Sequence, residues 1–356
     1  MRQAWRAIAG LLAIGAFAAG GTVALADNGN GNRGNALATT IFTMPAADGP
    51  PEGVAFDKRS GRFFVSRTGT GAIFAGTLGA PALTPFIAGG AASPNPVATG
   101  LKVRRGLLYV AGASTGQIRV YDLANPAAAP KVFDTGGGFI NDLDLDRHGN
   151  VFATDSTKST IFEVTAAQVA AGTGTPQAFD LSGSIASDPA AFNLNGIVVR
   201  RGGRELIAVQ SNVGKLWQIT FRDRSRGDHG RRAQATTTTP RVQEIQIQGG
   251  DGNVNGGDGL LVDRGRLLVV RGSTPHHANG AVQAFKLSRH DTRARFESET
   301  SDPSLTGPST IAQARNRLLI VNPNFAGAAN ATQFTVTGLA RNAIRHGGGG
   351  RGRHGR

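Results

Sequence analysis

Short apolar runs of about four to eight residues, each bounded by turn-forming residues, recur along most of the chain. Glycine is frequent in the turns, with 51 among the 356 residues, and stretches with helical periodicity are few. The runs form a larger repeat, in which an opening segment, a turn, a second run, a polar loop and a third run follow one another six times. This pattern predicts an all-β protein built from repeated units.

The opening segments of the six units align with one another in register. Each begins with a polar residue, which in four of the six is followed by glycine and then by apolar residues. The polar residues, which we call the ring residues, are Glu52, Thr99, Asn141, Asn195, Asp258 and Ser309. Five units continue into a looser fourth run. Units of about four strands with a period near 40–50 residues are typical of β-propellers.

The sixth unit has no fourth run, because the chain becomes basic and glycine-rich after Leu339. The run from Ala38 to Thr43 has no unit of its own. We therefore predict a six-bladed β-propeller in which this N-terminal strand supplies the outer strand of the last blade and closes the ring. Closure would protect the sheet edges of a chain that has no cysteine for disulfides. A β-sandwich, the alternative, fits poorly with six copies in register.

The two ends of the chain differ in composition from the repeats. Arg2, Arg6, an apolar run and the sequence Ala24-Leu25-Ala26 predict a signal peptide, with a membrane anchor as the alternative. The expected division is a signal peptide (1–26), a flexible linker (27–36), the propeller (37–339) and a disordered Arg/Gly-rich tail (340–356). The mature chain is then expected to be secreted, extracellular or associated with the cell wall, monomeric, and without a transmembrane segment.

The net charge of +14 is concentrated in a few segments. Residues 222–232 and 341–356 carry five arginines each, and neither tract has apolar periodicity. A basic tail of this kind on an exported protein is expected to bind an anionic cell-surface polymer, and nucleic acid is the less favoured partner. The absence of cysteine excludes thiol catalysis and thiolate metal sites.

In a propeller the first strand of each blade lines the central channel, so the ring residues are expected to meet at one mouth. Glu52 and Asp258 would then repel each other unless a cation lies between them. With the amide oxygens of Asn141 and Asn195 they form an oxygen ligand set, which suits Ca²⁺, Mg²⁺ or Mn²⁺. We predict one divalent cation, with calcium as the first candidate and magnesium, manganese or zinc as alternatives. Each of these side chains could instead cap a turn.

Four motifs resemble those of a known family. They are Pro51-Glu-Gly-Val-Ala-Phe-Asp57, the stretch from Asn141 to Ser156, Leu194-Asn-Gly-Ile-Val-Val199 and Gly257-Asp-Gly-Leu-Leu-Val-Asp263. Through them, residues 38–339 resemble the six-bladed propellers of the senescence-marker-protein, gluconolactonase and luciferin-regenerating-enzyme group. The resemblance implies that Glu52, Asn195 and Asp258 hold one divalent metal. It also implies that Asp258 acts as catalytic acid or base, and that Asn141 contacts the substrate, or the metal through water. Members of this group hydrolyse lactones and related esters, so the same reaction is expected here.

Two further features of the sequence concern the substrate and its contacts. No arginine lies between Gly136 and Ile140, although family members that act on sugar lactones carry one shortly before the residue that corresponds to Asn141. A less polar lactone or ester is therefore expected, and the alternative is a non-catalytic propeller that binds a ligand or the cell wall around a structural cation. His276 and His277 lie in a loop expected on the same face as the ring residues, and they are candidate substrate contacts.

Overall fold

The computed structural model describes residues 38–221 and 239–344, and these form an all-β protein with one short helix, α1 (Ala166–Ala171), and two 3-10 turns (Arg201–Gly203 and Ala328–Asn330). Within these residues, no helix is long and apolar enough to cross a membrane. The predicted signal peptide (1–26), the linker (27–36), the basic loop 222–232 and the tail from residue 345 onward lie outside the described residues.

The strands form four sheets of four strands and one sheet of eight. The first sheet contains β2 (Pro51–Phe56), β3 (Arg62–Arg67), β4 (Ile73–Thr77) and β5 (Thr84–Ile87). The second contains β6 (Leu101–Arg104), β7 (Leu107–Ala111), β8 (Gln117–Asp122) and β9 (Lys131–Asp134). The third contains β10 (Ile140–Leu145), β11 (Val151–Asp155), β12 (Thr160–Val164) and β13 (Gln177–Asp180).

The eight-stranded sheet consists of two antiparallel halves joined at their outer strands. One half is β14 (Leu194–Arg200), β15 (Glu205–Gln210), β16 (Lys215–Thr220) and β17 (Arg241–Gln248). The other half is β18 (Gly257–Asp263), β19 (Arg266–Arg271), β20 (Ala281–Leu287) and β21 (Arg293–Thr300). Strands β17 and β21 pair in parallel through Gln246–Gln248 and Arg293–Arg295, so two outer edges that would otherwise be exposed protect each other.

The remaining sheet brings the two ends of the described chain together. Its order is β1 (Thr40–Pro45), β24 (Gln333–Ala340), β23 (Arg317–Asn322) and β22 (Ile311–Ala314). Strand β1 pairs antiparallel with β24 from Thr40 opposite Gly338 to Pro45 opposite Gln333. The N-terminal strand therefore forms the outer edge of the sheet made by the last strands of the chain.

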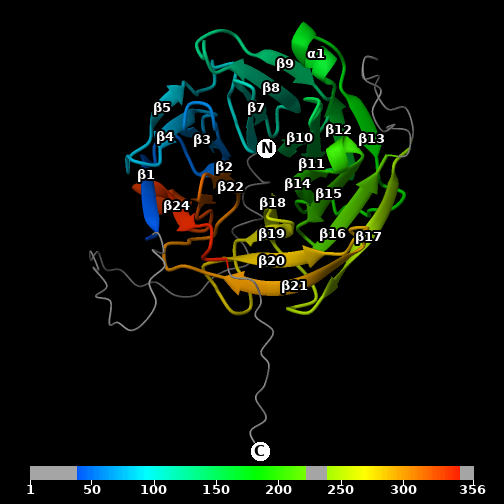
Figure 1. Ribbon diagram of the computed structural model, residues 1–356. Helices are drawn as coiled ribbons and strands as arrows, with labels where there is room; N and C mark the ends of the chain where they lie inside the picture. Colours follow the sequence, from blue (N-terminus) through cyan, green and yellow to red (C-terminus); the bar gives the residue numbers. More distant parts are fainter. Residues whose placement is uncertain (1–37, 222–238, 345–356) are drawn as a thin grey trace, which may run out of the picture.

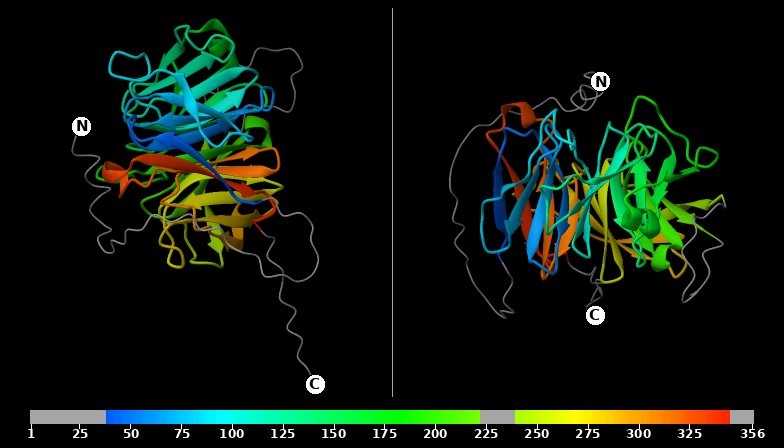
Figure 2. Two further views of the ribbon diagram at one scale, coloured as in Figure 1. Left: turned by 90° about the vertical axis from the view of Figure 1, so that its left-hand side faces the viewer. Right: turned by 90° about the horizontal axis from the view of Figure 1, so that it is seen from above.

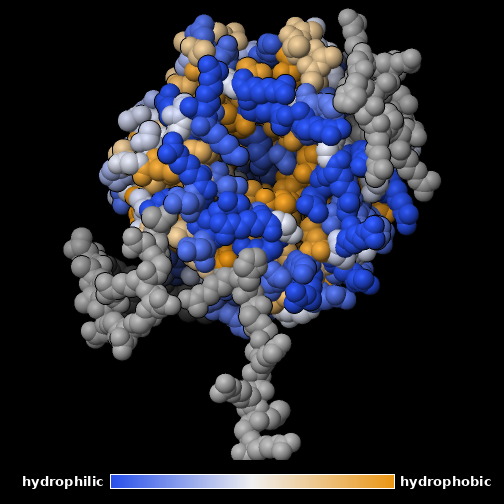
Figure 3. All heavy atoms as spheres, viewed as in Figure 1, coloured by the Kyte–Doolittle hydropathy of each residue, from blue (hydrophilic) through white to orange (hydrophobic). Residues whose placement is uncertain are grey.

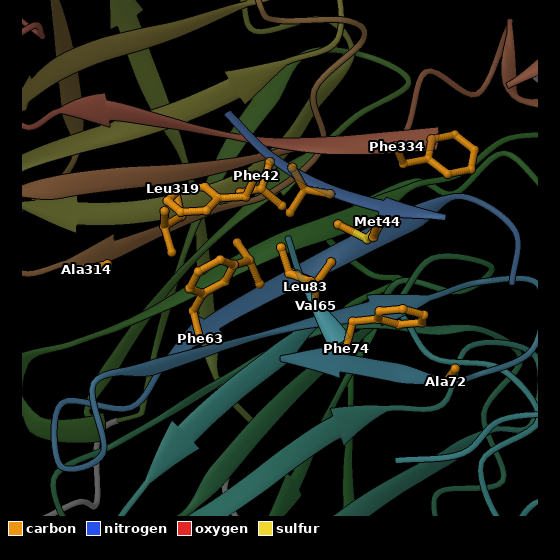
Figure 4. Close-up of a cluster of buried hydrophobic side chains, with 13 residues drawn as sticks. Phe42, Met44, Phe63, Val65, Ala72, Phe74, Leu83, Ala314, Leu319 and Phe334 are labelled. Atoms are coloured by element: carbon orange, nitrogen blue, oxygen red, sulfur yellow. The ribbon is translucent and has the colours of Figure 1, made fainter. Parts of the chain in front are cut away.

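The sheets are arranged around a central axis, with β2, β10, β14, β18 and β22 closest to it (Figure 1). Figure 2 shows the same sheets from the side, packed face to face around the ring. The apolar side chains of neighbouring sheets meet between them, because alternate residues of each strand point to opposite faces. Phe42 of β1, for example, packs against Phe63 of β3 with ring centroids 5.0 Å apart, inside the cluster drawn in Figure 4.

The packed structure extends beyond the predicted end of the propeller at residue 339. Ala340 belongs to β24, and the Arg341 guanidinium donates from Nε to Oδ1 of buried Asp263 at 2.6 Å. Ile344 is only 2% exposed, and its carbonyl accepts from Nη1 of Arg266 at 3.1 Å. The predicted start of the tail at residue 340 was therefore too early, because an apolar side chain and a buried ion pair hold residues 340–344 against the sheets.

The seam between β15 and the β20–β21 turn contains a buried acid, Glu205, whose proton uptake is expected to affect stability. Burial, followed by a hydrogen bond and charge repulsion from Asp291, raises the pKa of Glu205 to about 7, although Arg201 lies 2.9 Å from its carboxylate. An acid whose pKa is higher in the folded than in the unfolded protein stabilises the fold at low pH. That contribution is lost as the pH rises from about 4.5 towards 7.

We therefore expect the urea midpoint of unfolding to decrease as the pH is raised from 5 to 8. The midpoint of the Glu205→Gln variant should decrease less over the same range. The neutral amide removes the titration while retaining a hydrogen-bonding group towards Asp291. Glu244→Gln, at a more exposed carboxylate paired with Lys215, is the matched control and should keep the wild-type slope. Equal slopes for Glu205→Gln and the wild type would contradict this assignment.

Candidate functional site

The ring residues occupy equivalent positions in the strands nearest the axis. Four of them are the second residue of their strand: Glu52 of β2, Asn141 of β10, Asn195 of β14 and Asp258 of β18. Thr99 and Ser309 lie two residues before β6 and β22, where the backbone makes corresponding hydrogen bonds to the neighbouring strand. Figure 3 shows a hollow at the centre of the ring of sheets, on the face drawn there.

Each of the four lies in a β-bulge. In β2, Pro51 pairs with Arg67 and Val54 with Val65, so that Glu52 and Gly53 together oppose one residue of β3. The same register shift occurs at the start of β10, β14 and β18. A bulge changes the direction of the side chains that it carries, and bulges are common beside active sites. The repeated bulge therefore gives the ring side chains one shared direction that differs from regular strand alternation.

The glycines that follow ring residues allow neighbouring inner strands to approach closely. A Cβ atom added to Gly53 would lie 2.3 Å from the carbonyl oxygen of Thr99, and one added to Gly196 would lie 2.1 Å from that of Asp258. Between the last and first inner strands, the Ser309 hydroxyl donates to the carbonyl oxygen of Glu52 at 2.9 Å. These contacts explain why glycine recurs after the ring residue, and they bring the ring residues of adjacent strands side by side.

The two ring carboxylates lie close enough to influence each other's ionisation. Burial, followed by repulsion from Asp258 and Asp142, raises the pKa of Glu52 well above its usual value, and Lys102 offsets this only in part. Burial, followed by repulsion from Asp142, likewise raises the pKa of Asp258, although Asn195 donates a hydrogen bond to it. Glu52, Asn195 and Asp258, which were predicted to lie together, are therefore within electrostatic or hydrogen-bonding reach of one another.

Three oxygen atoms of this group have no hydrogen-bond partner among residues 38–221 and 239–344. They are Oε2 of Glu52, Oδ1 of Asn195 and Oδ1 of Asp258, and all three are buried. A buried acceptor without a partner destabilises the fold by about 1–3 kcal/mol, more for a charged group, so such atoms usually have a function. Two carboxylate oxygens and one amide oxygen are a donor set that hard divalent cations prefer, so these residues fit the predicted metal.

The fit depends on the amide as well as on the acids. Among residues 38–221 and 239–344, no group of three or more His, Cys, Asp or Glu side chains could hold a metal ion. A site made only of acids, histidines or cysteines is therefore not found in this part of the chain. Asn195 supplies the third oxygen, and any further positions around a cation would be open to water or substrate.

Asn141 is held by neighbours that fix its amide. Its Nδ2 donates to the hydroxyl of Ser156 at 2.8 Å, and that hydroxyl donates to the carbonyl of Leu194 at 2.5 Å. The chain of hydrogen bonds links the start of β10 to the start of β14 and determines which atom of the Asn141 amide remains available. Ser156 is therefore a positioning residue for Asn141.

An aromatic pair lies in the loops that lead into β10 and β14. Phe139 and Phe192 pack edge to face, with centroids 4.9 Å apart and an interplanar angle of 74°. The Asp155 carboxylate accepts hydrogen bonds from the backbone N–H of Gly138 at 2.7 Å and of Phe139 at 3.1 Å, which holds the first loop in place. The pair is only partly buried, and its members lie two residues before Asn141 and three residues before Asn195.

His276 and His277 interact with acids outside the ring. Nε2 of His276 lies 3.6 Å from Oδ1 of Asp251, and Nε2 of His277 lies 3.6 Å from Oε1 of Glu299. Their side chains are 70% and 41% exposed. Their role as substrate contacts stays a prediction, and the carboxylate partners give each imidazole a local structural explanation as well.

Several charged residues of the centre were not singled out from the sequence. Nζ of Lys102 in β6 lies 3.9 Å from Oδ1 of Asp142 in β10, and Asp144 follows two residues later on the same strand. The available signal was position: both Lys102 and Asp144 occur three residues after a ring residue. The other four units have apolar residues there, namely Ala55, Val198, Leu261 and Ala312.

No protein-family model and no curated protein sequence matches the chain. Solved structures do match. A gluconolactonase of Xanthomonas campestris superposes with a TM-score of 0.56 and 15% identity, over 84% of this chain and 89% of its own. The allergen Mala s 1 of Malassezia sympodialis gives 0.60 and 15%, over 85% and 95%. The calcium-binding protein regucalcin of Agrobacterium tumefaciens gives 0.55 and 17%, over 85% and 96%.

These neighbours confirm the predicted resemblance to gluconolactonase-type propellers. At identities of 15–17% the likeness shows the fold alone. The chemistry depends on the residues at the centre of this molecule.

Proposed function

We propose that this protein is a secreted, divalent-metal-dependent hydrolase of lactones or related esters, which acts at the central channel of a six-bladed propeller. The observation that carries the proposal is the group of three buried, unpartnered oxygens on Glu52, Asn195 and Asp258. The likeness to a gluconolactonase fold supports the same reaction class.

In the proposed six-bladed architecture, the eight-stranded sheet corresponds to two blades. Strand β1 is the outer strand of the last blade, so that the N-terminal strand closes the ring. The pairing of β1 with β24 supports this closure, as does the hydrogen bond from Ser309 to the carbonyl of Glu52. Closure of this kind covers the edge of β24 and joins the two ends of the described chain in one sheet without a disulfide.

Glu52, Asn195 and Asp258 would hold one cation, and calcium is the first candidate because every donor is oxygen. Magnesium, manganese and zinc are the alternatives. When bound, the cation would polarise the substrate carbonyl and lower the pKa of a water molecule.

The protein's own side chains would move the proton. Water adds to the carbonyl carbon, and Asp258 accepts the proton that the water gives up. The bond between the carbonyl carbon and the ester oxygen then breaks, and Asp258 returns the proton to the departing alkoxide oxygen. The hydrogen bond from Asn195 orients Asp258, and the Asn141 amide, fixed by Ser156, orients the substrate.

An apolar acyl or alkyl group is the proposed feature of the substrate. Phe139 and Phe192 form a partly exposed aromatic pair in the loops that lead into β10 and β14, and the loop residues Gly136 to Phe139 contain no arginine that could bind sugar hydroxyls. Hydrophobic contact with an aromatic pair favours longer alkyl chains over hydroxylated rings. The lack of this arginine also favours the second candidate function, a non-catalytic propeller that binds an apolar ligand around a structural cation.

The purified protein should hydrolyse γ- and δ-lactones with rates that increase with alkyl chain length, and prefer them to glucono-lactone. EDTA should abolish the activity, and added Ca²⁺, Mg²⁺, Mn²⁺ or Zn²⁺ should restore it, as measured by pH-stat titration. Calorimetry on the same samples separates the two functions. Metal binding without turnover of any lactone or ester would favour the non-catalytic binding function. Chelation that changes neither activity nor melting temperature would contradict the proposed metal site.

Secretion, a monomeric state and binding of the basic tail to an anionic cell-surface polymer complete the proposal. Secretion rests on the sequence features at 1–26, and the polymer partner on the arginines among residues 345–356. No nucleic-acid partner is proposed.

A further inference from the structure

One lysine near the axis of the molecule, Lys102, interacts electrostatically with three carboxylates, those of Asp142, Asp144 and Glu52. Nζ of Lys102 is 3.9 Å from Oδ1 of Asp142, and about a fifth of the lysine side chain is solvent-accessible, against 4% of the Asp142 side chain. Burial lowers the pKa of Lys102, but the charges of Asp142, Asp144 and Glu52 outweigh this and raise it overall. The ammonium group therefore stays charged.

The carboxylates near Lys102 are held by the backbone of the next inner strand. Oδ2 of Asp142 accepts from the N–H of Ile197 at 3.4 Å, and Oδ2 of Asp144 accepts from the N–H of Val199 at 2.7 Å. These bonds connect β10 to β14 through side chains. The backbone of β14 thus engages Oδ2 of each acid, while Lys102 of β6 approaches Oδ1 of Asp142.

Polar residues at this depth occur at only one part of the ring. The corresponding positions in four other units are Ala55, Val198, Leu261 and Ala312. Ala55 and Val198 belong to buried apolar clusters, and Leu261 and Ala312 are partly buried and pack against two others. An apolar residue at position 102 would fill the space between the neighbouring sheets equally well, so the lysine has another role.

Lys102 lies three residues beyond Thr99, which corresponds to roughly 7–10 Å along the strand from the level of the ring residues. Inner strands β2 and β6 are in close contact there, because a Cβ atom on Gly53 would lie 2.9 Å from the backbone nitrogen of Leu101. The ammonium group is accordingly within electrostatic reach of Glu52. Because Lys102 is further along its inner strand than Thr99, its backbone is displaced along the channel from the level of the ring residues.

We propose that Lys102 is a positioning residue that acts as a fixed counter-cation beneath the candidate metal site. Its charge weakens the binding of the divalent ion, so that the ion remains exchangeable and the carboxylates do not over-neutralise the charge of the ion. This inference rests on the proposed metal site. Without Lys102, the four carboxylates Glu52, Asp142, Asp144 and Asp258 would exceed the charge of one divalent ion by two units. With Lys102 the excess is one unit.

The sign of the expected effect separates this role from a merely structural one. A unit charge roughly 7–10 Å from a divalent ion, at an effective dielectric constant of about 20, changes its affinity by more than tenfold. Proton uptake by the remaining acids offsets part of this change in affinity. Removing Lys102 should therefore strengthen metal binding by about tenfold or more, whereas damage to the channel would weaken it.

The test is calorimetric titration of chelator-treated protein with Ca²⁺ alone at fixed pH and salt. Lys102→Met should bind Ca²⁺ about tenfold or more tightly than wild type, and Lys102→Arg should bind within a few-fold of it. Lys215→Met removes one positive charge at an exposed pair with Glu244 and should leave the affinity unchanged. The double variant Lys102→Met/Asp144→Asn removes one charge of each sign and should return the affinity to near the wild-type value.

Lys102→Met binding that is equal to or weaker than wild type, while Lys215→Met is unchanged, would overturn the inference and leave the proposed function intact. Tighter binding by Lys102→Met that persists undiminished in the double variant would overturn it as well, since the effect would then not follow net charge. If Lys102→Met does not fold, the double variant and Asp144→Asn alone still decide, because Asp144→Asn should weaken Ca²⁺ binding about tenfold. Absence of Ca²⁺, Mg²⁺ and Mn²⁺ binding in every variant would overturn both the inference and the proposed metal site.

Discussion

Asp258→Asn is expected to reduce lactone hydrolysis by about a thousandfold or more and divalent-metal affinity by about a hundredfold. The substitution conserves the shape of the side chain but removes one of only two carboxylates among the candidate ligands. It also removes the group that would exchange the proton with water and leaving alcohol. The measurements are pH-stat hydrolysis and Ca²⁺ titration of the full-length variant.

The same variant should be no less stable than the wild type when both are free of metal. Burial and repulsion from Asp142 raise the pKa of Asp258, so its ionised form destabilises the metal-free fold once the pH exceeds the usual carboxyl value. An amide avoids this cost, and the melting temperature without metal should stay the same or increase. Asp134→Asn, at an exposed position of β9, is the control for loss of one charge and should retain full activity.

A catalytic role for Asp258 would be contradicted by an Asp258→Asn variant that hydrolyses lactones at the wild-type rate. If instead the variant lost activity and also unfolded at lower temperature, the residue would be holding the channel together. The combination of lost activity with retained or increased stability is typical of a functional site, where groups are kept at some expense to the fold.

Gly196→Ala is expected to destabilise the protein by about 3 kcal/mol, the largest effect on stability that we expect from a single methyl group. The new Cβ atom would lie 2.1 Å from the carbonyl oxygen of Asp258, which belongs to the backbone of the adjacent inner strand and cannot rotate away. Strands β14 and β18 must separate, and Asn195 and Asp258 must separate with them. Chemical denaturation would measure the stability and Ca²⁺ titration the ligand geometry.

Gly183→Ala is the matched control, because no atom lies within 4 Å of the added Cβ and its φ is not in the left-handed region. Its effect on stability should stay within about 0.5 kcal/mol. If Gly196→Ala were tolerated equally well, the close contact between inner strands would not hold in solution. Close packing of the inner strands would then not be the reason for glycine after the ring residues.

The sequence was sufficient to locate the candidate site along the chain. Apolar runs such as Arg266-Leu-Leu-Val-Val-Arg271 correspond to strands, and the four ring residues Glu52, Asn141, Asn195 and Asp258 all occur at the second position of an inner strand. Strand alternation and turn residues are properties of neighbouring residues, so they can be recognised without knowledge of the fold. The N-terminal strand was also recognisable, because its apolar run had no unit of its own.

Contacts between distant strands could not be obtained in this way. The parallel pairing of β17 with β21 depends on two outer edges meeting, and nothing in the residues Gln246–Gln248 indicates a partner near residue 294. Likewise, the pairing of His277 with Glu299 and of Arg341 with Asp263 follows from loops and ends that fold back on the sheets. The Lys102–Asp142 pair joins inner strands of adjacent sheets.

The sequence by itself determined the all-β character, the repeated unit and the polar residue near the start of each inner strand, because each depends on a local alternation of apolar and polar side chains. Only the tertiary structure decided which of those polar residues share a centre, how the bulges turn their side chains, and that a lysine lies among the acids. The physical reason is distance along the chain. Residues about 50–200 positions apart become neighbours only when the sheets are arranged around one axis, and burial there changes their charge and hydrogen bonding in ways that no local pattern specifies.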